Sequence, residues 1–251
     1  MTYETYQHLI YSWMVLGVVI SLVLLRVAAP FGRHTTSGWG PMINNRMGWM
    51  VMEMPGMMLL MYFVITNITS QNIVTGVLVG FYMFHYINRA FVYSFRIHTR
   101  GKKIPAIVVC FGICFNLVNG FFLGYYFGHF AQYSLDYFIT PQFIAGTALF
   151  GTGIYINWKY DNKLIHLRRS GDTGYVIPFG GLFEWVSCPN LLGEIIEWSG
   201  YALLCWNLPA VSFVVWTAAN LIPRALSHHK WYKKRFGDYP EERKALFPFV
   251  L

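Results

Sequence analysis

The sequence is poor in charged residues and lacks any ordered set of cysteines. Only 12% of its 251 residues are Asp, Glu, Lys or Arg, about half the share in soluble domains. Its four cysteines include no Cys-x-x-Cys pair, which argues against a structural zinc site or a disulfide framework. No Gly-x-Gly-x-x-Gly motif follows a strand-like segment, and Gly151-Thr-Gly153 lies inside an apolar helical run. A Rossmann dinucleotide site is therefore excluded.

The chain also lacks a tandem repeat, a low-complexity tract and a linker that would separate a second domain. No basic cluster precedes its first apolar run, so that run is expected to be a retained span and not a signal peptide. Hydrophobic residues make up 55% of the chain and aromatic residues 19%. These features predict a single integral membrane domain covering residues 1–251.

Seven apolar runs have lengths near the roughly 20 residues that a bilayer core requires. They lie at residues 9–29, 48–67, 73–95, 104–130, 137–158, 191–206 and 208–223. Thr140-Pro141 supplies a start signal for the fifth helix. The predicted fold is all-α, a polytopic bundle of seven transmembrane helices. A six-span alternative, in which the last two runs form one re-entrant unit, stays open.

The basic residues give an independent test of this topology. All 19 Lys and Arg residues fall in four stretches, 26–46, 89–103, 159–169 and 224–244. The alternate connections contain none, which predicts an outside amino terminus and a cytosolic carboxyl tail. This placement accounts for the net charge of +8 without a nucleic-acid partner. The membrane is expected to be a bacterial inner membrane or the endoplasmic reticulum.

Two polar residues in the second and third spans are candidates for catalysis. Glu53 interrupts the second span, where a carboxyl group costs about 3 kcal/mol on insertion scales and is a functional candidate by default. Tyr86 lies in the third span, in the same cytosolic half of the membrane as Glu53, so a hydrogen bond between the two is feasible. An interhelical anchor remains the alternative for Glu53. Asn116 and Asn119 are also intramembrane polar groups, of the type that often joins helices.

The segment from Pro178 to Tyr201 carries a second polar pattern. A glycine pair precedes Ser187-Cys188-Pro189, which predicts an N-cap with proline in the first helical turn. On the helix that follows, one face collects Asn190, Glu194, Glu197 and Tyr201. A solvated acidic face is the alternative interpretation.

Two further polar faces end apolar spans on the predicted cytosolic side. One contains Asn157, Asp161 and Arg168, and the other contains Arg224, His228, Tyr232 and Arg235. Together with Asn190 and Glu194 they could line one cavity, in which arginines suit phosphates and carboxylates suit ribose hydroxyls. The eight histidines are scattered, so we expect no metal site.

Several motifs resemble the steroid 5α-reductase family of NADPH-dependent membrane reductases, over about residues 52–251. They are Gly180-Gly-Leu-Phe, Asn190-x-Leu-Gly-Glu-Ile-Ile-Glu-Trp198, Arg224-Ala-x-x-His228-His-x-x-Tyr232, Asp238-Tyr-Pro-x-x-Arg243-Lys-Ala-Leu-x-Pro-Phe and His85-Tyr-x-x-Arg-x-Phe-Val-Tyr93. The resemblance implies a seven-helix bundle that holds NADPH at its cytosolic opening and admits a steroid enone from the lipid bilayer.

The resemblance also implies roles for individual residues. Glu53 and Tyr86 would be the catalytic pair that hydrogen-bonds the 3-keto oxygen. The cofactor-binding residues would be Asn157, Asp161, Arg168, Asn190, Glu194, Arg224, His228, Tyr232, Arg243 and Lys102. The residues expected to contact the substrate are Arg89, Trp198 and Asn119.

Three positions depart from the family pattern. Met52 stands where glutamine commonly precedes the glutamate, which would change the substrate pocket. Val176 and Lys102 replace common arginines, so the contacts to the cofactor phosphates, and with them the preference for NADPH over NADH, are expected to differ.

The predicted activity is reduction of the Δ4 double bond of 3-oxo-Δ4-steroids, with hydride addition to C5. The alternatives are a sibling reductase of polyprenol or 2-enoyl-CoA, a membrane methyltransferase of the isoprenylcysteine type, and a non-catalytic sterol receptor.

Overall fold

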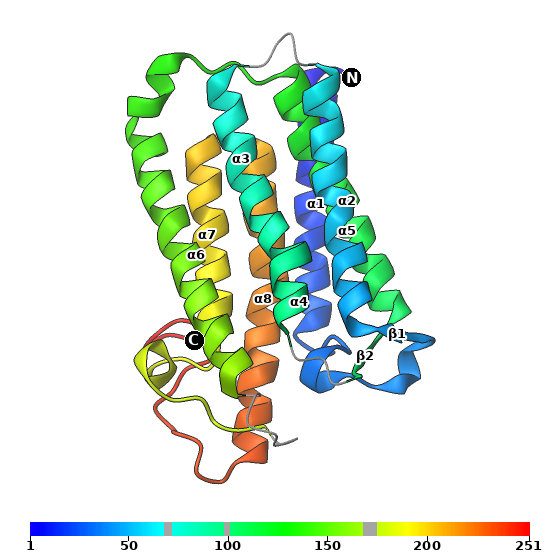
Figure 1. The fold of residues 1–251 in the computed structure, drawn as a ribbon, viewed down its shortest axis with the longest axis vertical. Helices are drawn as coiled ribbons and strands as arrows, with labels where there is room; N and C mark the ends of the chain where they lie inside the picture. The colour runs from blue at the N-terminus through cyan, green and yellow to red at the C-terminus, as the bar shows by residue number, and fades with distance from the viewer. Residues whose placement is uncertain (68–71, 98–100, 168–174) are drawn as a thin grey trace.

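The computed structural model describes residues 1–67, 72–97, 101–167 and 175–251. Within these residues, seven long helices form an upright bundle (Figure 1). They are α1 (Tyr3–Leu24), α2 (Asn45–Thr66), α3 (Ile73–Ile87), α5 (Ala106–His129), α6 (Pro141–Leu167), α7 (Pro189–Cys205) and α8 (Leu208–Arg235). The third helix continues through a π-helical segment, η4 (Asn88–Tyr93), into the short α4 (Ser94–Arg96). Each predicted span overlaps one of these long helices.

Four of the described helices, α1, α2, α5 and α8, are long and apolar enough to cross a membrane. The fold is thus that of a largely helical membrane protein. The amino terminus lies at one end of the bundle, and the carboxyl tail lies at the other (Figure 1). The described parts of the four basic stretches lie at the end that carries the carboxyl tail.

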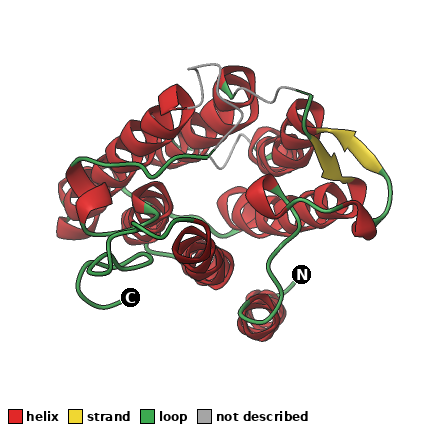
Figure 2. Ribbon diagram, turned by 90° about the horizontal axis from the view of Figure 1, so that it is seen from below, coloured by secondary structure: helices red, strands yellow, loops and turns green. Residues whose placement is uncertain are grey.

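A small antiparallel sheet departs from the predicted all-α fold. Strand β1 (Met42–Asn44) pairs with β2 (Lys103–Pro105) at the carboxyl-tail end of the bundle (Figures 1 and 2). The fourth predicted span therefore begins too early, at residue 104, because the residue before a proline is driven towards extended backbone. The fifth span also begins later than predicted, since residues 135–139 form a 3₁₀ helix. The helical start at Pro141 is confirmed.

Glycines allow two pairs of helices to pack at backbone contact. A Cβ atom on Gly146 of α6 would lie 2.5 Å from the backbone nitrogen of Leu204 on α7. On the other side of the bundle, a Cβ on Gly120 of α5 would lie 2.5 Å from the carbonyl oxygen of Gly56 on α2. Small residues at such positions let helices approach closely in membranes. Gly153 serves this packing too, facing Glu197.

Helix α1 lies at the edge of the bundle (Figure 2). It is attached to α8 through Trp13 and Trp216, whose rings stack with centroids 4.3 Å apart. The Trp216 indole also donates a hydrogen bond of 2.9 Å to the Trp13 carbonyl oxygen. The central core lies between the other helices and contains Tyr82, Trp198 and Phe213.

The carboxyl tail folds back onto the segment that precedes α7. Backbone hydrogen bonds join Ser187 to Lys244 and Cys188 to Ala245. The prediction that Ser187 caps α7 is wrong, because Cys188 occupies the N-cap position and makes no side-chain cap. The Ser187 hydroxyl instead lies 2.6 Å from His229 Nδ1 and 2.6 Å from the Tyr239 hydroxyl, so it ties the tail to α8. Pro189 is in the first turn, as predicted.

Candidate active site

One buried arginine joins acidic side chains from three helices. Arg89 Nε lies 3.9 Å from Glu53 Oε1, and its terminal nitrogens lie 3.6 Å from Asp161 Oδ2 and 4.0 Å from Glu194 Oε2. All four side chains are only 8 to 13% exposed. Arg89 belongs to the π-helical segment η4, a type of helix that is frequent at functional sites. It therefore connects predicted catalytic and cofactor-binding residues.

Glu53 and Tyr86 both contact the side chain of Asn116, which comes from α5. The Tyr86 hydroxyl donates a 2.8 Å hydrogen bond to Asn116 Oδ1. The Asn116 amide nitrogen donates to Glu53 Oε2 at 3.4 Å and to the Met52 carbonyl oxygen at 2.7 Å. The predicted catalytic pair is therefore brought to one place, but through a third residue instead of a direct hydrogen bond.

The polar face of α7 points into the bundle. Asn190 donates to Asp161 Oδ1 at 2.8 Å, and Glu194 contacts Arg89. Glu197 is fully buried and lies 2.5 Å from His85 Nδ1. The solvated-face alternative is thus wrong for this helix. Packing at backbone contact between α6 and α7 brings Asn190 against Asp161.

A charged cleft opens at the carboxyl-tail end of the bundle. Its empty space, counted out to its open mouth, is about 1060 Å³. Six predicted cofactor-binding residues line it: Lys102, Asp161, Asn190, Arg224, His228 and Tyr232. Tyr93 of the His85–Tyr93 motif lines it too, as do residues that the sequence did not single out, among them Phe31, Arg33, Trp49 and Tyr175.

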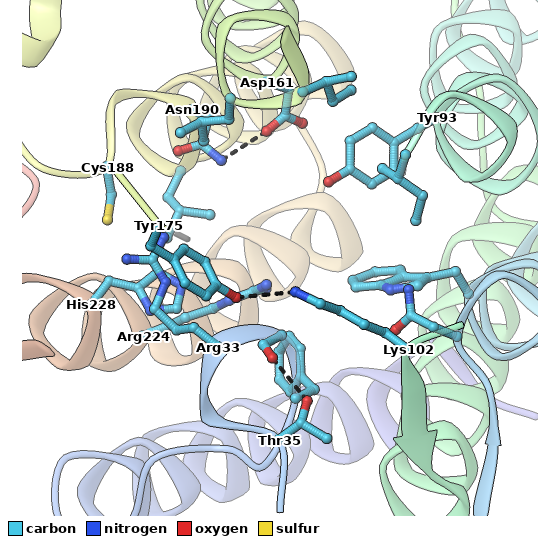
Figure 3. Close-up of a pocket in the computed structure, with 18 of the residues that line it drawn as sticks. Arg33, Thr35, Tyr93, Lys102, Asp161, Tyr175, Cys188, Asn190, Arg224 and His228 are labelled. Atoms are coloured by element: carbon cyan, nitrogen blue, oxygen red, sulfur yellow. Dashed lines mark hydrogen bonds between the residues drawn. The ribbon is translucent and has the colours of Figure 1, made fainter. Parts of the chain in front are cut away.

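The cations of this cleft gather on one side. Arg33, Lys102 and Arg224 face Asp161 and Asn190 across the opening (Figure 3). Arg33 is held by aromatic rings, with its guanidinium carbon 4.4 Å from the Tyr232 centroid. Within the described part of the chain, the buried atoms Arg33 Nη1 and Arg224 Nε have no hydrogen-bond partner. These unused donors, together with the acceptors opposite, fit a ligand with phosphates and hydroxyl groups.

Two histidines stack beside the cleft, and one of them, His228, lines it. The rings of His34 and His228 are 5.2 Å apart, and His34 Nε2 lies 3.1 Å from His228 Nδ1. One nitrogen must donate and the other accept, so at least one ring is neutral. Burial lowers the pKa of His34 below its usual 6.5, and the positive charges of Arg33 and Arg224 lower it further.

Several predicted site residues lie away from the cleft wall. Asn157 is buried and donates to the Asn190 carbonyl oxygen at 3.0 Å. Arg243 is also buried, and its Nη1 donates to the Pro178 carbonyl oxygen at 3.1 Å. Arg168 lies outside the described residues.

The predicted substrate contacts are distributed over the bundle interior. Arg89 occupies the acidic cluster described above. Trp198 lies in the aromatic core, with ring centroids 4.6 Å from His85 and 6.0 Å from Tyr86. Asn119 accepts a 3.4 Å hydrogen bond from the Trp13 indole, so it faces α1. Arg89 and Trp198 thus surround the predicted catalytic pair, whereas Asn119 does not contact it.

Fold and site together define a helical membrane protein in which a charged cleft leads towards a buried carboxyl and phenol. A family model described as 3-oxo-5-alpha-steroid 4-dehydrogenase matches residues 102–251, more than half of the chain. The chain is 40% identical over 237 residues to 3-oxo-5-alpha-steroid 4-dehydrogenase 1 of Rattus norvegicus, covering 92% of this chain and 90% of the relative. It is 38% identical over 241 residues to steroid 5-alpha-reductase DET2 of Gossypium hirsutum, covering 92% and 91%.

A human relative, 3-oxo-5-alpha-steroid 4-dehydrogenase 1, is 34% identical over 223 residues and covers 88% of this chain and 86% of its own. The chain therefore belongs to the steroid 5α-reductase family, as its motifs indicated. It is a membrane oxidoreductase of steroid metabolism, and the family uses a nicotinamide cofactor.

Proposed function

We propose that this protein uses NADPH to reduce the Δ4 double bond of 3-oxo-Δ4-steroids, giving 5α-reduced 3-oxosteroids. The observation that carries the proposal is the contact of Arg89 with Glu53 on one side and with Asp161 on the other. Asp161 lines the charged cleft. A continuous polar path thus leads from the cleft to the buried acid, as a reaction between a cleft-bound cofactor and a lipid-soluble ketone requires.

Glu53 and Tyr86 are the residues we assign to the substrate ketone. Both reach the same asparagine from different helices, so one oxygen atom placed beside them can receive hydrogen bonds from both, with Glu53 donating in its protonated form. Negative charge grows on that oxygen as the enone is reduced. Fixed donors in a site from which water is excluded stabilise this charge more than water does. Protonation at C4, by water or by the Tyr86 hydroxyl, completes the product.

The cleft is the site we assign to NADPH, which when bound supplies the hydride that adds to C5. Arg33, Lys102 and Arg224 would hold its phosphates, because guanidinium and ammonium groups form charge-assisted hydrogen bonds with them. Asp161 and Asn190 would hold ribose hydroxyls. His228 and Tyr232 complete the wall on the side of α8.

The same proposal sets the protein in its membrane. Residues 1–251 form one domain that crosses the bilayer seven times, with the amino terminus outside and the cleft open to the cytosol. The odd number of long helices among the described residues and the clustering of basic connections at one end support this arrangement. The steroid enters from the lipid.

The test is Glu53→Gln in full-length protein purified in detergent, with the exposed acid Glu4 replaced by Gln as the matched control. Wild type and the Glu4→Gln control should reduce progesterone or testosterone with NADPH. Glu53→Gln should lose turnover by about 100-fold or more, yet still gain thermal stability from NADPH. Wild-type turnover by Glu53→Gln would refute the assignment. A product from a polyprenol or an enoyl-CoA alone, or stabilisation by S-adenosylmethionine instead of NADPH, would refute the proposed function.

A further inference from the structure

We propose that Asn116 is a positioning residue that sets the spacing of Glu53 and Tyr86 and the direction of the Tyr86 hydroxyl hydrogen. This inference rests on the proposed function, and it adds a third residue to the catalytic pair. The Asn116 side chain is buried, with 3% of the residue exposed. Its amide contacts Tyr86 at one end and Glu53 at the other.

The Met52 carbonyl oxygen decides which way the amide points. It lies 2.7 Å from Asn116 Nδ2, and it can only accept a hydrogen bond. If the amide were turned over, Asn116 Oδ1 would face that carbonyl at hydrogen-bond distance without a hydrogen between them. The amide oxygen is therefore fixed towards Tyr86. Because this oxygen has no hydrogen, the Tyr86 hydroxyl must be the donor in their 2.8 Å contact.

The backbone of α5 is held in place beside this contact. Gly120, one turn beyond Asn116, packs directly on Gly56 of α2, and a Cβ added to it would lie 2.5 Å from the Gly56 carbonyl oxygen. A Cβ on Gly56 would in turn lie 3.2 Å from the Asn116 carbonyl oxygen. Asn116 is thus fixed on the same helix pair that carries Glu53. Only Tyr86 comes from elsewhere, on α3.

This arrangement has a direct chemical use. The oxygen and nitrogen of one amide are rigidly spaced, so Tyr86 and Glu53 are held at a separation that lets both reach a single ketone oxygen. When the ketone arrives, the Tyr86 hydrogen can turn from Asn116 to the substrate by rotation about its C–O bond, while the ring stays in place. Donors whose heavy atoms are already in place are those that stabilise a transition state.

The experiment compares Asn116→Leu, Asn116→Asp and Tyr86→Phe in the full-length enzyme, with NADPH and testosterone. Asn116→Leu removes both amide contacts, and its kcat should fall by up to about 100-fold. Its KM should change far less, because the steroid still binds in the same apolar site. Asn116→Asp should retain clearly more turnover than Asn116→Leu, because its carboxyl group in the protonated form can donate to the Met52 carbonyl oxygen and still accept from the Tyr86 hydroxyl.

A double variant tests whether Asn116 acts through Tyr86. In the Tyr86→Phe background, Asn116→Leu should lower kcat little further, because the effects of substituting residues that act as a unit are not additive. The matched control is Asn207→Ala, which removes another buried asparagine, the N-cap of α8 near the opposite end of the bundle. It should lower the melting temperature but leave kcat, KM and the Tyr86→Phe effect unchanged.

Three results would overturn the inference: wild-type kcat in Asn116→Leu, no rescue by Asn116→Asp, or full multiplication of the two effects in the double variant. If Asn116→Leu does not fold, the inference is tested by comparing the kcat of Asn116→Asp with that of the unsubstituted residue, once with Tyr86 present and once in Tyr86→Phe. The proposed function fails separately, if Glu53→Gln or Tyr86→Phe turns over steroid at the wild-type rate.

Discussion

Gly153 on α6 lies directly against the backbone of Glu197 on α7, leaving no room for a Cβ atom at position 153. The Glu197 carboxyl group also meets α3, where His85 Nδ1 is 2.5 Å away. One turn along α6, Asn157 meets the Asn190 carbonyl oxygen. The polar interior of the bundle is therefore held together by glycine contacts between two helices, and it should respond to changes far from any ligand.

Gly153→Ala should destabilise the protein by about 1 to 3 kcal/mol, because a methyl group there must displace backbone. The melting temperature in detergent measures this loss. Gly151→Ala is the matched control, since nothing lies within 4 Å of a Cβ at that position of the same helix. This variant should leave the stability unchanged or raise it by up to about 1 kcal/mol, because alanine favours a helix more than glycine does. Equal melting temperatures for the two variants would contradict the packing described for α6 and α7.

Arg89→Met should destabilise the fold, because it leaves Glu53, Asp161 and Glu194 close together without their cation. Removing one partner of a buried ion pair costs about 3 to 5 kcal/mol. The loss should be smaller when Asp161→Asn is added, since one of the unpaired carboxyl groups then disappears. Arg26→Met, at an exposed position, controls for the loss of one charge. A melting temperature that the second substitution fails to raise would show that Arg89 acts by packing alone.

Much of the site could be predicted because its residues obey helical spacing. Asn190 and Glu194 recur on one face of an apolar helix. Polar side chains on a membrane helix almost always face the interior of the bundle. Counting along the helices also placed Glu53 and Tyr86 in the same half of the membrane, on spans adjacent in sequence. What spacing could not give was the contact between them, because that depends on how α2, α3 and α5 are arranged in space.

Residues outside regular helices could not be predicted in this way. Arg33 reaches the cleft from the connection between α1 and α2, which has no periodicity. Its only signal was membership of a basic stretch.

Asn116 lies inside a regular helix, but the sequence presented it as one of two intramembrane asparagines with the same structural explanation. The structure separates them, since Asn119 faces Trp13 while Asn116 contacts both members of the proposed catalytic pair. The strand before α5 was missed because Ile104-Pro105 begins an apolar run.

His34 should make the protein less stable as the pH falls. Its pKa in the folded state lies below the usual 6.5, so below about pH 6.5 the unfolded chain binds more protons than the folded one and stability declines. At higher pH both states are neutral at this residue and its contribution is constant. The melting temperature of His34→Gln should therefore fall less than that of wild type when the pH is lowered from about 7.5 to 5.5. His8→Gln, at an exposed position on α1, retains His34 and should follow wild type. Parallel curves for His34→Gln and wild type would contradict this assignment.

Lys102 should contribute to the proposed preference for NADPH over NADH. Its ammonium lines the cleft and lies 3.4 Å from the Tyr175 hydroxyl, with the Tyr175 ring 5.2 Å away. NADPH differs from NADH by one phosphate, so Lys102→Met should weaken NADPH binding more than NADH binding. Because the side chain is exposed, the selective loss should be no more than about tenfold.

Lys102→Arg should act in the opposite direction, because a guanidinium binds phosphate through two parallel hydrogen bonds. Dissociation constants for both cofactors, from ligand-induced shifts in melting temperature, measure the change at low and high salt. Lys230→Met removes the same charge from an exposed position that does not line the cleft, and it should leave the ratio of the two constants unchanged. If Lys102→Met weakens NADPH and NADH equally, Lys102 serves the shared phosphates, and the selectivity must come from the other cations of the cleft, Arg33, Lys103 and Arg224.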